Sequence, residues 1–294
     1  MELDRQLDLQ LLLIDPQNDF CDLPADMHAG HASPALPVPG AHADMGRVAA
    51  LIRAAGDGLT GISVTLDSHH RLDIAHPTFW SDGQGGEVAP FTEISAADVR
   101  AGRYRPRDPA AAARALAYLD ALELAGRYRL MIWPVHCEIG SWGNAVHAEV
   151  QAALDAWQVQ SGQRVNNVIK GTNPWTEHYS AILAEVPDAQ DPATALNTAL
   201  ISLLARADRV YIAGEASSHC VRATTEHLVD NLPSAHAARL VLLTDCMSPV
   251  SGFDAQHAQF IVAMQARGVR TATSAGVLGE LKANAPAAPV SAHD

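Results

Sequence analysis

The stretch YIAGEASSHCVRATTEHL, from Tyr211 to Leu228, decides the fold of this chain. Its apolar beginning, up to Ala213, is typical of a buried strand, and a helical pattern of apolar residues starts near Cys220. The small residues in between allow the backbone to turn tightly. A strand that turns directly into a helix is the repeating unit of α/β proteins, so the stretch predicts that class. It also raises a question, because a cysteine at this junction is either a core residue or a nucleophile.

The same alternation of strand and helix runs along most of the chain. Helical patterns lie near residues 43–56, 109–126, 143–158, 193–207, 218–231 and 254–267. Alternation of this kind predicts a parallel sheet with helices on both faces, and almost wholly apolar runs fit strands that are buried on both faces. The predicted strands are Leu9–Ile14, Gly61–Leu66, Arg129–Trp133, Val165–Ile169, Val210–Ala213 and Leu240–Thr244.

Composition excludes several classes of function. The 294 residues carry a formal net charge of −13, whereas a protein that binds nucleic acid would show a basic surface. No apolar run is long enough to span a membrane, and Met1–Gln10 is too charged for a signal peptide. We therefore expect a cytoplasmic protein with neither a nucleic-acid nor a membrane partner. The four cysteines form no CxxC pair and should be free thiols.

The chain shows no convincing domain linker, and we expect a single domain over residues 1–282. A long insertion between the second and third predicted strands, about residues 68–108, is rich in glycine, proline and aromatic residues. Loops of this length are usually functional or disordered, and the aromatic residues argue against disorder. Residues 283–294, ANAPAAPVSAHD, are rich in alanine and proline and predict a flexible tail.

Chemically active residues collect directly after the predicted strands. In open parallel sheets, ligands bind beyond the carboxyl ends of the strands, so these segments should meet at one edge. In chain order, the segments are DPQNDFC, DSHH, PVHCE, KGTNPW, GEASSHC and DCMSP.

Cys220 is the candidate nucleophile at this edge. It would lie in the first turn of a helix, where the helix dipole and unpaired N–H groups favour a thiolate, and N–H groups of the tight turn can form an oxyanion hole. A lone cysteine is more often a core residue. Cys21, Cys137 and Cys246 also follow strands, so position alone does not choose among them.

Asp15 and Lys170 are candidate activators of a thiol, because both lie at strand ends. A buried carboxylate can accept the thiol proton, and an ammonium group can stabilise the thiolate. The plainer interpretation makes Asp15 a turn cap and Lys170 a solvated loop charge. Only two of the 20 basic residues are lysines, which weakens the plainer interpretation of Lys170.

A metal site is the third element of the predicted edge. Asp67 and His69 are two residues apart, so their side chains point the same way in an extended strand, and His136 follows the next predicted strand. One carboxylate and two imidazoles suit zinc, with iron or manganese as alternatives. His76 is a candidate fourth ligand. Any one of these histidines, taken alone, is more simply a surface or hydrogen-bonded residue.

Five ordered blocks in the chain resemble the isochorismatase-like cysteine hydrolases, and within them the metal-containing nicotinamidases. The resemblance covers about residues 8–275. Five blocks in order, each at a strand end, are a specific signal where one alone would be weak. The blocks are LLLIDPQNDFC with Asp15, VTLDSHH with Asp67 and His69, WPVHC with His136, VIKGTNPWTEHYSAI with Lys170, and IAGEASSHCV with Cys220.

The resemblance implies a six-stranded, mostly parallel sheet in a three-layer, Rossmann-type arrangement, often in an oligomer. It implies that Asp15, Lys170 and Cys220 are catalytic. It also implies further roles, namely a cis Glu215–Ala216 peptide bond, an oxyanion hole made by the N–H groups of Ala216 and Cys220, and substrate contacts from Phe20, Trp133 and His219.

The chain departs from the resemblance at several points. Ser217 and Ser218 stand where Thr-Asp is usual, and DSHH lacks the aromatic residue between the metal ligands. Glu215 and Glu138 stand where apolar or small residues are usual, and the insertion after His69 is long. These departures leave the catalytic residues intact and bear on the choice of substrate.

The sequence therefore predicts an amidohydrolase that cleaves a small carboxamide through a cysteine thioester, with one divalent metal ion. Nicotinamide, converted to nicotinate and ammonia, is the first candidate substrate. The alternative is a related metal-dependent cysteine amidase that acts on another small amide. A catalytically idle binding protein is the third hypothesis, which the intact Asp15, Lys170 and Cys220 disfavour.

Overall fold

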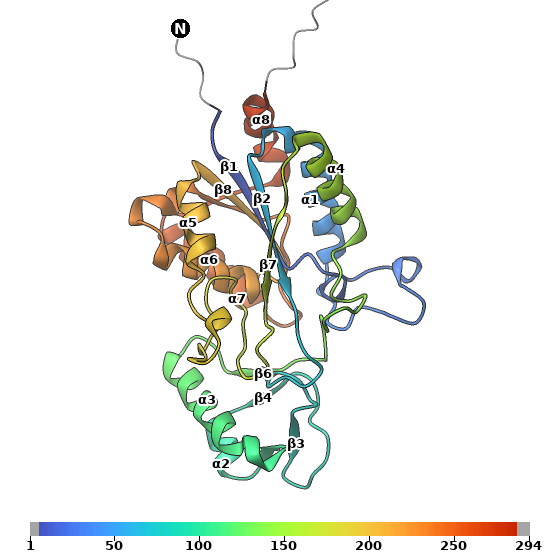
Figure 1. Cartoon of the computed structure of the whole chain (residues 1–294), viewed down its shortest axis with the longest axis vertical. Helices are drawn as coiled ribbons and strands as arrows, with labels where there is room; N and C mark the ends of the chain where they lie inside the picture. Colours follow the sequence, from blue (N-terminus) through green and yellow to red (C-terminus); the bar gives the residue numbers. More distant parts are fainter. Residues whose placement is uncertain (1–5, 287–294) are drawn as a thin grey trace, which may run out of the picture.

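The main sheet is built from six strands in the order β10-β9-β8-β1-β2-β7, within residues 6–286, which the computed structural model describes. Every pair of neighbouring strands in it is parallel, and the sheet runs through the middle of the molecule (Figure 1). The strands are β1 (Leu9–Ile14), β2 (Gly61–Asp67), β7 (Asn166–Lys170), β8 (Arg209–Gly214), β9 (Leu240–Leu243) and β10 (Arg270–Ala272).

Helices cover both faces of this sheet (Figure 1). On one side lie α1 (Ala41–Ala55), α4 (Ala148–Ser161) and α8 (Ser274–Asn284). On the other side lie α5 (Thr198–Arg206), α6 (Cys220–Asn231) and α7 (Asp254–Ala266). The predicted α/β class and the three-layer arrangement are thus confirmed. None of the helices within residues 6–286 is long and apolar enough to cross a membrane.

The centre of the core is β1, whose six residues are all buried, as a strand between two helical layers requires. The end of β8 lies so close to it that only glycine fits at position 214. A Cβ atom on Gly214 would lie 1.9 Å from the carbonyl oxygen of Ile14, and the φ of Gly214 is +119°. The turn that carries Cys220 therefore starts where β8 lies in close contact with β1.

A second unit, which we call the lobe, comprises residues 80–132 and lies beyond the main sheet (Figure 1). It holds two antiparallel strand pairs, β3 with β5 and β4 with β6. Its elements are β3 (Trp80–Asp82), β4 (Thr92–Ile94), α2 (Ala96–Arg100), β5 (Tyr104–Pro106), α3 (Ala112–Ala125) and β6 (Leu130–Ile132). Most of the predicted insertion, residues 68–108, thus folds into regular structure.

Two predictions about the strands need correction. The predicted strand Arg129–Trp133 is β6, which belongs to the lobe, and the sixth place in the main sheet is taken by β10, which was not predicted. A short apolar run shows that a strand is buried but not which sheet it joins. The residues of β10 are partly exposed at the sheet edge and lack the apolar signal.

The end of the chain also differs in part from expectation. The predicted tail begins at residue 283, but α8 runs to Asn284, whose side chain donates hydrogen bonds to the carbonyl oxygens of Leu7 and Gly58. Residues 287–294 of the predicted tail lie outside the described residues. Six short 3-10 helices complete the described structure, at Asn18–Phe20, Ala25–Met27, Gly56–Gly58, Pro109–Ala111, Pro192–Thr194 and Ser234–Arg239.

Candidate active site

The register of the main sheet brings the predicted catalytic residues to one edge. Asp67 at the end of β2 pairs with Lys170 at the end of β7, and Ile14 at the end of β1 pairs with Gly214 at the end of β8. Asp15 is the next residue after β1. The carboxyl ends of four adjacent strands therefore surround one small volume, as the sequence predicts.

Lys170 lies at the centre of this group and is almost wholly buried. Its Nζ atom is 2.8 Å from Asp15 Oδ2, 3.0 Å from Asp67 Oδ1 and 3.7 Å from Cys220 Sγ, and it donates a hydrogen bond to the carbonyl oxygen of His178. A compact ammonium group can reach all of these groups at once, whereas a planar guanidinium would suit a bidentate partner. The contacts explain a lysine at this position in a chain that otherwise prefers arginine.

Asp15 is fixed by Thr65 of the neighbouring strand β2. The Asp15 N–H donates to the carbonyl oxygen of Thr65 at 3.1 Å, and the Thr65 hydroxyl donates to Asp15 Oδ1 at 2.5 Å. The backbone φ of Asp15 is +45°, in the left-handed region that non-glycine residues rarely adopt. These bonds leave Oδ2 free to face Lys170.

Cys220 is the first residue of α6 and lines the same volume, with ligand atoms of Asp15, Asp67 and Cys220 all within 4.8 Å of one another. The Glu215–Ala216 peptide bond is cis, as the resemblance implies. Within the described residues, the N–H groups of Ala216 and Cys220 donate to no other protein group, whereas that of Ser217 is bonded to the carbonyl oxygen of Ser248. Ala216 and Cys220, whose N–H groups are free to donate, both line the same pocket, as an oxyanion hole requires.

The protonation of the site differs from the thiolate that the sequence predicts. Burial raises the pKa of Cys220 well above its usual value, and nearby Lys170 only partly opposes this effect. Burial also raises the pKa of Asp15, again against Lys170. For Lys170, burial favours the neutral form, but Asp15 and Asp67 outweigh it and raise its pKa well above the usual value. Burial thus favours the neutral thiol of Cys220, whereas the two neighbouring aspartates favour the charged form of Lys170.

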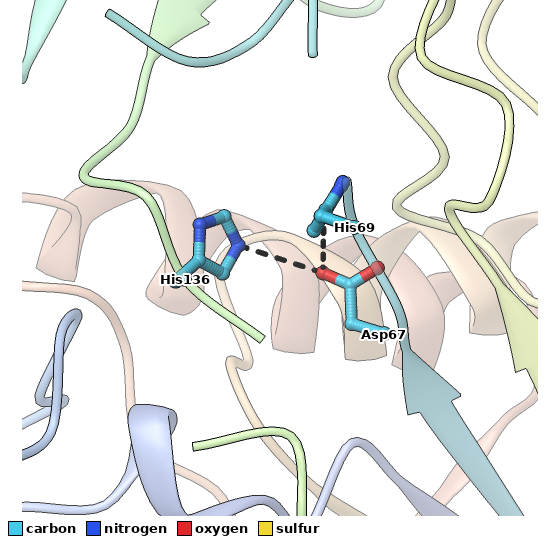
Figure 2. A group of neighbouring side chains, drawn as sticks. All are labelled: Asp67, His69 and His136. Carbon is cyan, nitrogen blue, oxygen red and sulfur yellow. Dashed lines mark hydrogen bonds and ion pairs between the residues drawn. The ribbon is translucent and has the colours of Figure 1, made fainter. Parts of the chain in front are cut away.

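The predicted metal ligands Asp67, His69 and His136 converge on one point. In Figure 2, the dashed lines from His69 and His136 meet at one oxygen of the Asp67 carboxylate. Asp67 Oδ2 is 3.1 Å from His69 Nε2 and 3.6 Å from His136 Nε2, and all three side chains are buried. Two nitrogens and one oxygen at such distances form an open ligand set.

The outer contacts of the two histidines fit a metal site. His69 Nδ1 lies 3.1 Å from Asp73 Oδ2, and His136 Nδ1 lies 2.8 Å from the carbonyl oxygen of Pro134. Because an Nδ1–H that donates to these oxygens leaves Nε2 with its lone pair, both rings present a ligand atom toward Asp67. The residues therefore fit zinc, iron or manganese. Asp73 was not predicted, because a partner four residues after His69 carries no signal of its own.

His76 packs against both histidines of this cluster, with its ring centroid 5.1 Å from that of His69 and 5.3 Å from that of His136. Its Nε2 atom is 3.3 Å from His136 Nδ1, which is the nitrogen on the side away from Asp67. Burial lowers the pKa of His76 to about 3, so the ring is neutral. The three converging ligand atoms belong to Asp67, His69 and His136, and His76 stays a candidate fourth ligand next to them.

A pocket opens over Cys220 and the metal ligands, and the predicted substrate contacts Phe20, Trp133 and His219 all line it. Trp133 donates a hydrogen bond from its indole N–H to the hydroxyl of Tyr179 at 3.0 Å. The free volume is about 20 Å³, which is room for about one water molecule.

Glu177 is a pocket residue that sequence reasoning missed. It lines the pocket together with Asp67 and His136, and its Oε2 atom is buried without a hydrogen-bond partner among the described residues. Burial raises its pKa to about 7. Its position seven residues after Lys170 carries no strand-end signal, so only the folded loop reveals it. An unpartnered carboxylate oxygen here is available to a cation or to the amide group of a ligand.

The two glutamates that depart from the resemblance have different surroundings. Glu138 is partly exposed and forms an ion pair with Arg71 at 2.9 Å, and it does not line the pocket. Glu215 is wholly buried behind the turn that carries Ala216. Of the two, only Glu215 lies next to the reacting groups.

Of the comparisons with known proteins, only the comparison with solved structures gives matches. No protein-family profile matches the chain, and no curated protein is similar to it in sequence. Among solved structures, a nicotinamidase/pyrazinamidase of Acinetobacter baumanii is similar with a TM-score of 0.60 and 18% identity, over 93% of this chain and 99% of that chain. The yeast nicotinamidase Pnc1p is similar with a TM-score of 0.59 and 21% identity, over 90% and 98%.

The chain has the fold of the nicotinamidases. A third structure, the pyrazinamidase of Pyrococcus horikoshii in complex with zinc, is similar with a TM-score of 0.54 and 19% identity, over 90% of this chain and 99% of that chain. The isochorismatase-like fold that the sequence resemblance implies is thereby confirmed. At these sequence identities, the similarity to the nicotinamidases shows a shared fold. The activity has to be inferred from the residues of the site.

Proposed function

We propose that this protein is an amidohydrolase that converts nicotinamide to nicotinate and ammonia through a thioester on Cys220. The observation that carries the proposal is the contact of Lys170 with Asp15, Asp67 and Cys220 at the base of one pocket. A nucleophile, a base and a buried cation lie together, as amide cleavage by a thiol requires. The nicotinamidase fold supports nicotinamide as the first substrate to test.

In the first half of the reaction, Asp15 accepts the proton of Cys220 while the sulfur attacks the amide carbon. Because burial raises the pKa of Cys220, the sulfur needs Asp15 to accept its proton before or as it attacks. Lys170 stabilises the charge that develops on sulfur. The N–H groups of Ala216 and Cys220 donate to the carbonyl oxygen as it becomes negative. Asp15 returns the proton to the leaving nitrogen, so ammonia departs and a thioester remains.

In the second half, water attacks the thioester and Asp15 accepts a proton from it. The carbon–sulfur bond breaks, the acid leaves and Cys220 regains its proton. A divalent ion held by Asp67, His69 and His136 would supply a Lewis acid beside the pocket, with zinc first and iron or manganese as alternatives. The aromatic rings of Phe20, Trp133 and His219 would hold a flat heteroaromatic ring and exclude bulk water.

The direct test is ammonia release from nicotinamide by purified protein, with and without a chelator. We expect rapid release that chelation abolishes and added zinc restores. Activity that survives complete removal of metal would contradict the metal assignment. A metal-loaded protein that hydrolyses other small amides but not nicotinamide would keep the mechanism and overturn the substrate.

Three other proposals rest on sequence and resemblance. We propose a single domain with one insertion, a homo-oligomer and a cytoplasmic location. A single domain should resist limited proteolysis between the main sheet and the lobe, and light scattering should give a mass above the 31.2 kDa of one chain. A monomer in light scattering would contradict the oligomer.

A further inference from the structure

The buried pair Glu215 and Asp44 lies behind the turn that carries the Ala216 N–H group. Glu215 is 0% exposed and Asp44 is 2% exposed. The Ser248 N–H donates to Glu215 Oε2 at 3.2 Å, whereas Glu215 Oε1 has no donor among the described residues. A buried carboxylate oxygen without a donor is costly, so this atom requires an explanation.

Asp44, the carboxyl group next to Glu215, differs from it because two groups donate to Asp44. The Ser248 hydroxyl donates to Asp44 Oδ2 at 2.6 Å, and Arg47 forms an ion pair with Asp44 Oδ1. Glu215, by contrast, has no ion pair in the described part of the chain. Burial raises the pKa of Glu215 well above its usual value, and the neighbouring Asp44 carboxylate adds to the shift. Glu215 and Asp44 both accept hydrogen bonds from Ser248, and of two such buried carboxyl groups the one without a cation keeps its proton.

We infer that Glu215 is a positioning residue whose neutral carboxyl group donates to Asp44, accepts from the Ser248 N–H, and so fixes the Ala216 N–H of the oxyanion hole. The inference rests on the proposed amidohydrolase function, and it assigns Glu215 no contact with the substrate. The acceptor on Asp44 belongs to α1 and the donor on Ser248 to the loop after β9, so Glu215 ties the catalytic turn to two separate elements.

Hydrogen bonds restrain the chain on both sides of Ala216. Before it, Glu215 donates its N–H to the carbonyl oxygen of Ile14 at 2.8 Å and accepts from Ser248 through its side chain. After it, the Ser217 N–H donates to the carbonyl oxygen of Ser248 at 2.9 Å. Ser248 thus bonds both neighbours of Ala216, which leaves the Ala216 N–H little freedom. An apolar residue at 215 would keep the backbone bonds and lose the side-chain tether.

Two variants separate the hydrogen bonds of Glu215 from its charge. Glu215→Gln keeps one donor and one acceptor in nearly the same shape, and it should retain kcat within about threefold. Glu215→Leu fills the space but cannot bond, and it should lower kcat by about 10- to 100-fold, because a displaced oxyanion donor weakens transition-state stabilisation. KM should change by less than about threefold in both, because the tether does not touch the ground-state amide.

Nicotinaldehyde distinguishes a positioning role from a general loss of structure. The Cys220 thiol adds to the carbonyl group of an aldehyde and gives a thiohemiacetal, whose oxygen would occupy the oxyanion hole. Glu215→Leu should weaken nicotinaldehyde inhibition by the same factor as kcat and leave nicotinate inhibition unchanged. Equal losses for both ligands, or no loss of kcat, would overturn the inference.

Infrared difference spectroscopy tests the protonation without any assay of activity. The wild-type spectrum minus that of Glu215→Gln should show the carbonyl stretch of a protonated carboxyl group at about pH 8, above the pKa of about 7 of Glu177 and Glu185. Absence of that band would overturn the inference even if Glu215→Leu fails to fold. Failure of the proposed function is distinct, because the wild-type protein itself would then release no ammonia.

Discussion

The main sheet and the lobe place their residues by different means. In the main sheet, neighbouring parallel strands fix Asp67 opposite Lys170 and put Asp15 one residue beyond β1. The lobe has four strands of three residues each, which form two separate antiparallel pairs. Trp133, the residue that follows β6, lines the pocket. The sheet therefore holds the reacting groups in register, while Trp133, at the end of the lobe, forms part of the pocket wall.

The largest effect should come from removing the reacting atom at the sheet edge. Cys220→Ala should lower the rate of amide hydrolysis by at least about 10³-fold, because the thioester cannot form. Cys246→Ala is the matched control, since Cys246 is equally buried after β9 but does not line the pocket. Ammonia release measures both. Comparable losses in the two variants would contradict a special role for Cys220.

Replacing one glycine by alanine in the main sheet and one in the lobe compares how well each region accommodates an added methyl group. In the sheet, Gly214→Ala would press a methyl group against the carbonyl oxygen of Ile14 at a φ of +119°, and it should cost more than about 4 kcal/mol or prevent folding. In the lobe, Gly126→Ala also has a positive φ, of +67°, but meets no atom within 4 Å, and it should cost about 1 kcal/mol. Urea unfolding gives both values. Similar costs would show that the sheet edge is no more tightly built than the lobe.

The junction between the regions contains a buried acid whose charge is costly. Glu185 Oε2 is 3.3 Å from Arg127, which follows α3 of the lobe, and burial raises the pKa of Glu185 to about 7. A carboxyl group whose folded pKa exceeds its unfolded value contributes stability below pH 4.5, which is lost as the pH rises through about 7.

Glu185→Gln cannot ionise, so its stability relative to wild type should rise between about pH 5 and pH 8. The gain should be about 3 kcal/mol at most, from 1.4 kcal/mol for each unit of pKa difference. Urea unfolding across this range measures it. Glu149→Gln, at an exposed ion pair, is the control and should show no such trend. A relative stability that falls with pH would mean that the Arg127 ion pair outweighs burial.

The smallest effect should come from the lobe-side wall of the pocket. Trp133→Phe removes the hydrogen bond to Tyr179 and should raise KM by about fivefold, equivalent to about 1 kcal/mol, with little change in kcat. Trp157→Phe loses a similar bond, from its indole N–H to the carbonyl oxygen of Gly56, but lies in α4 away from the pocket. Steady-state kinetics should show an unchanged KM there. A drop in kcat for Trp133→Phe would place Trp133 among the reacting groups.

The division between sheet and lobe also explains what sequence could predict. Asp15, Asp67 and Lys170 follow apolar runs in a parallel sheet, so their meeting at one edge follows from local pattern alone. The placement of β6 could not be foreseen, because LMI is as apolar as a strand of the main sheet. Glu177 lies in a loop without periodicity, and its burial depends on contacts that the sequence does not display.

Charge states were the second limit of sequence reasoning. A helix N-terminus and a nearby lysine predict a thiolate at Cys220, but complete burial reverses that balance and favours the thiol. The cost of burial depends on how the other elements close over a residue, which no motif records. Glu215 is the same case, since a glutamate in a tight turn gives no sign that it is wholly enclosed beside Asp44.

The most direct test of the central claim is mass spectrometry of the protein quenched in acid during turnover of nicotinamide. The account predicts a mass increase of one nicotinoyl group on the peptide that contains Cys220, absent from Cys220→Ala and lost on treatment with hydroxylamine. Turnover of nicotinamide with no adduct at any quench time, together with undiminished turnover by Cys220→Ala, would contradict a thioester mechanism at this edge of the sheet.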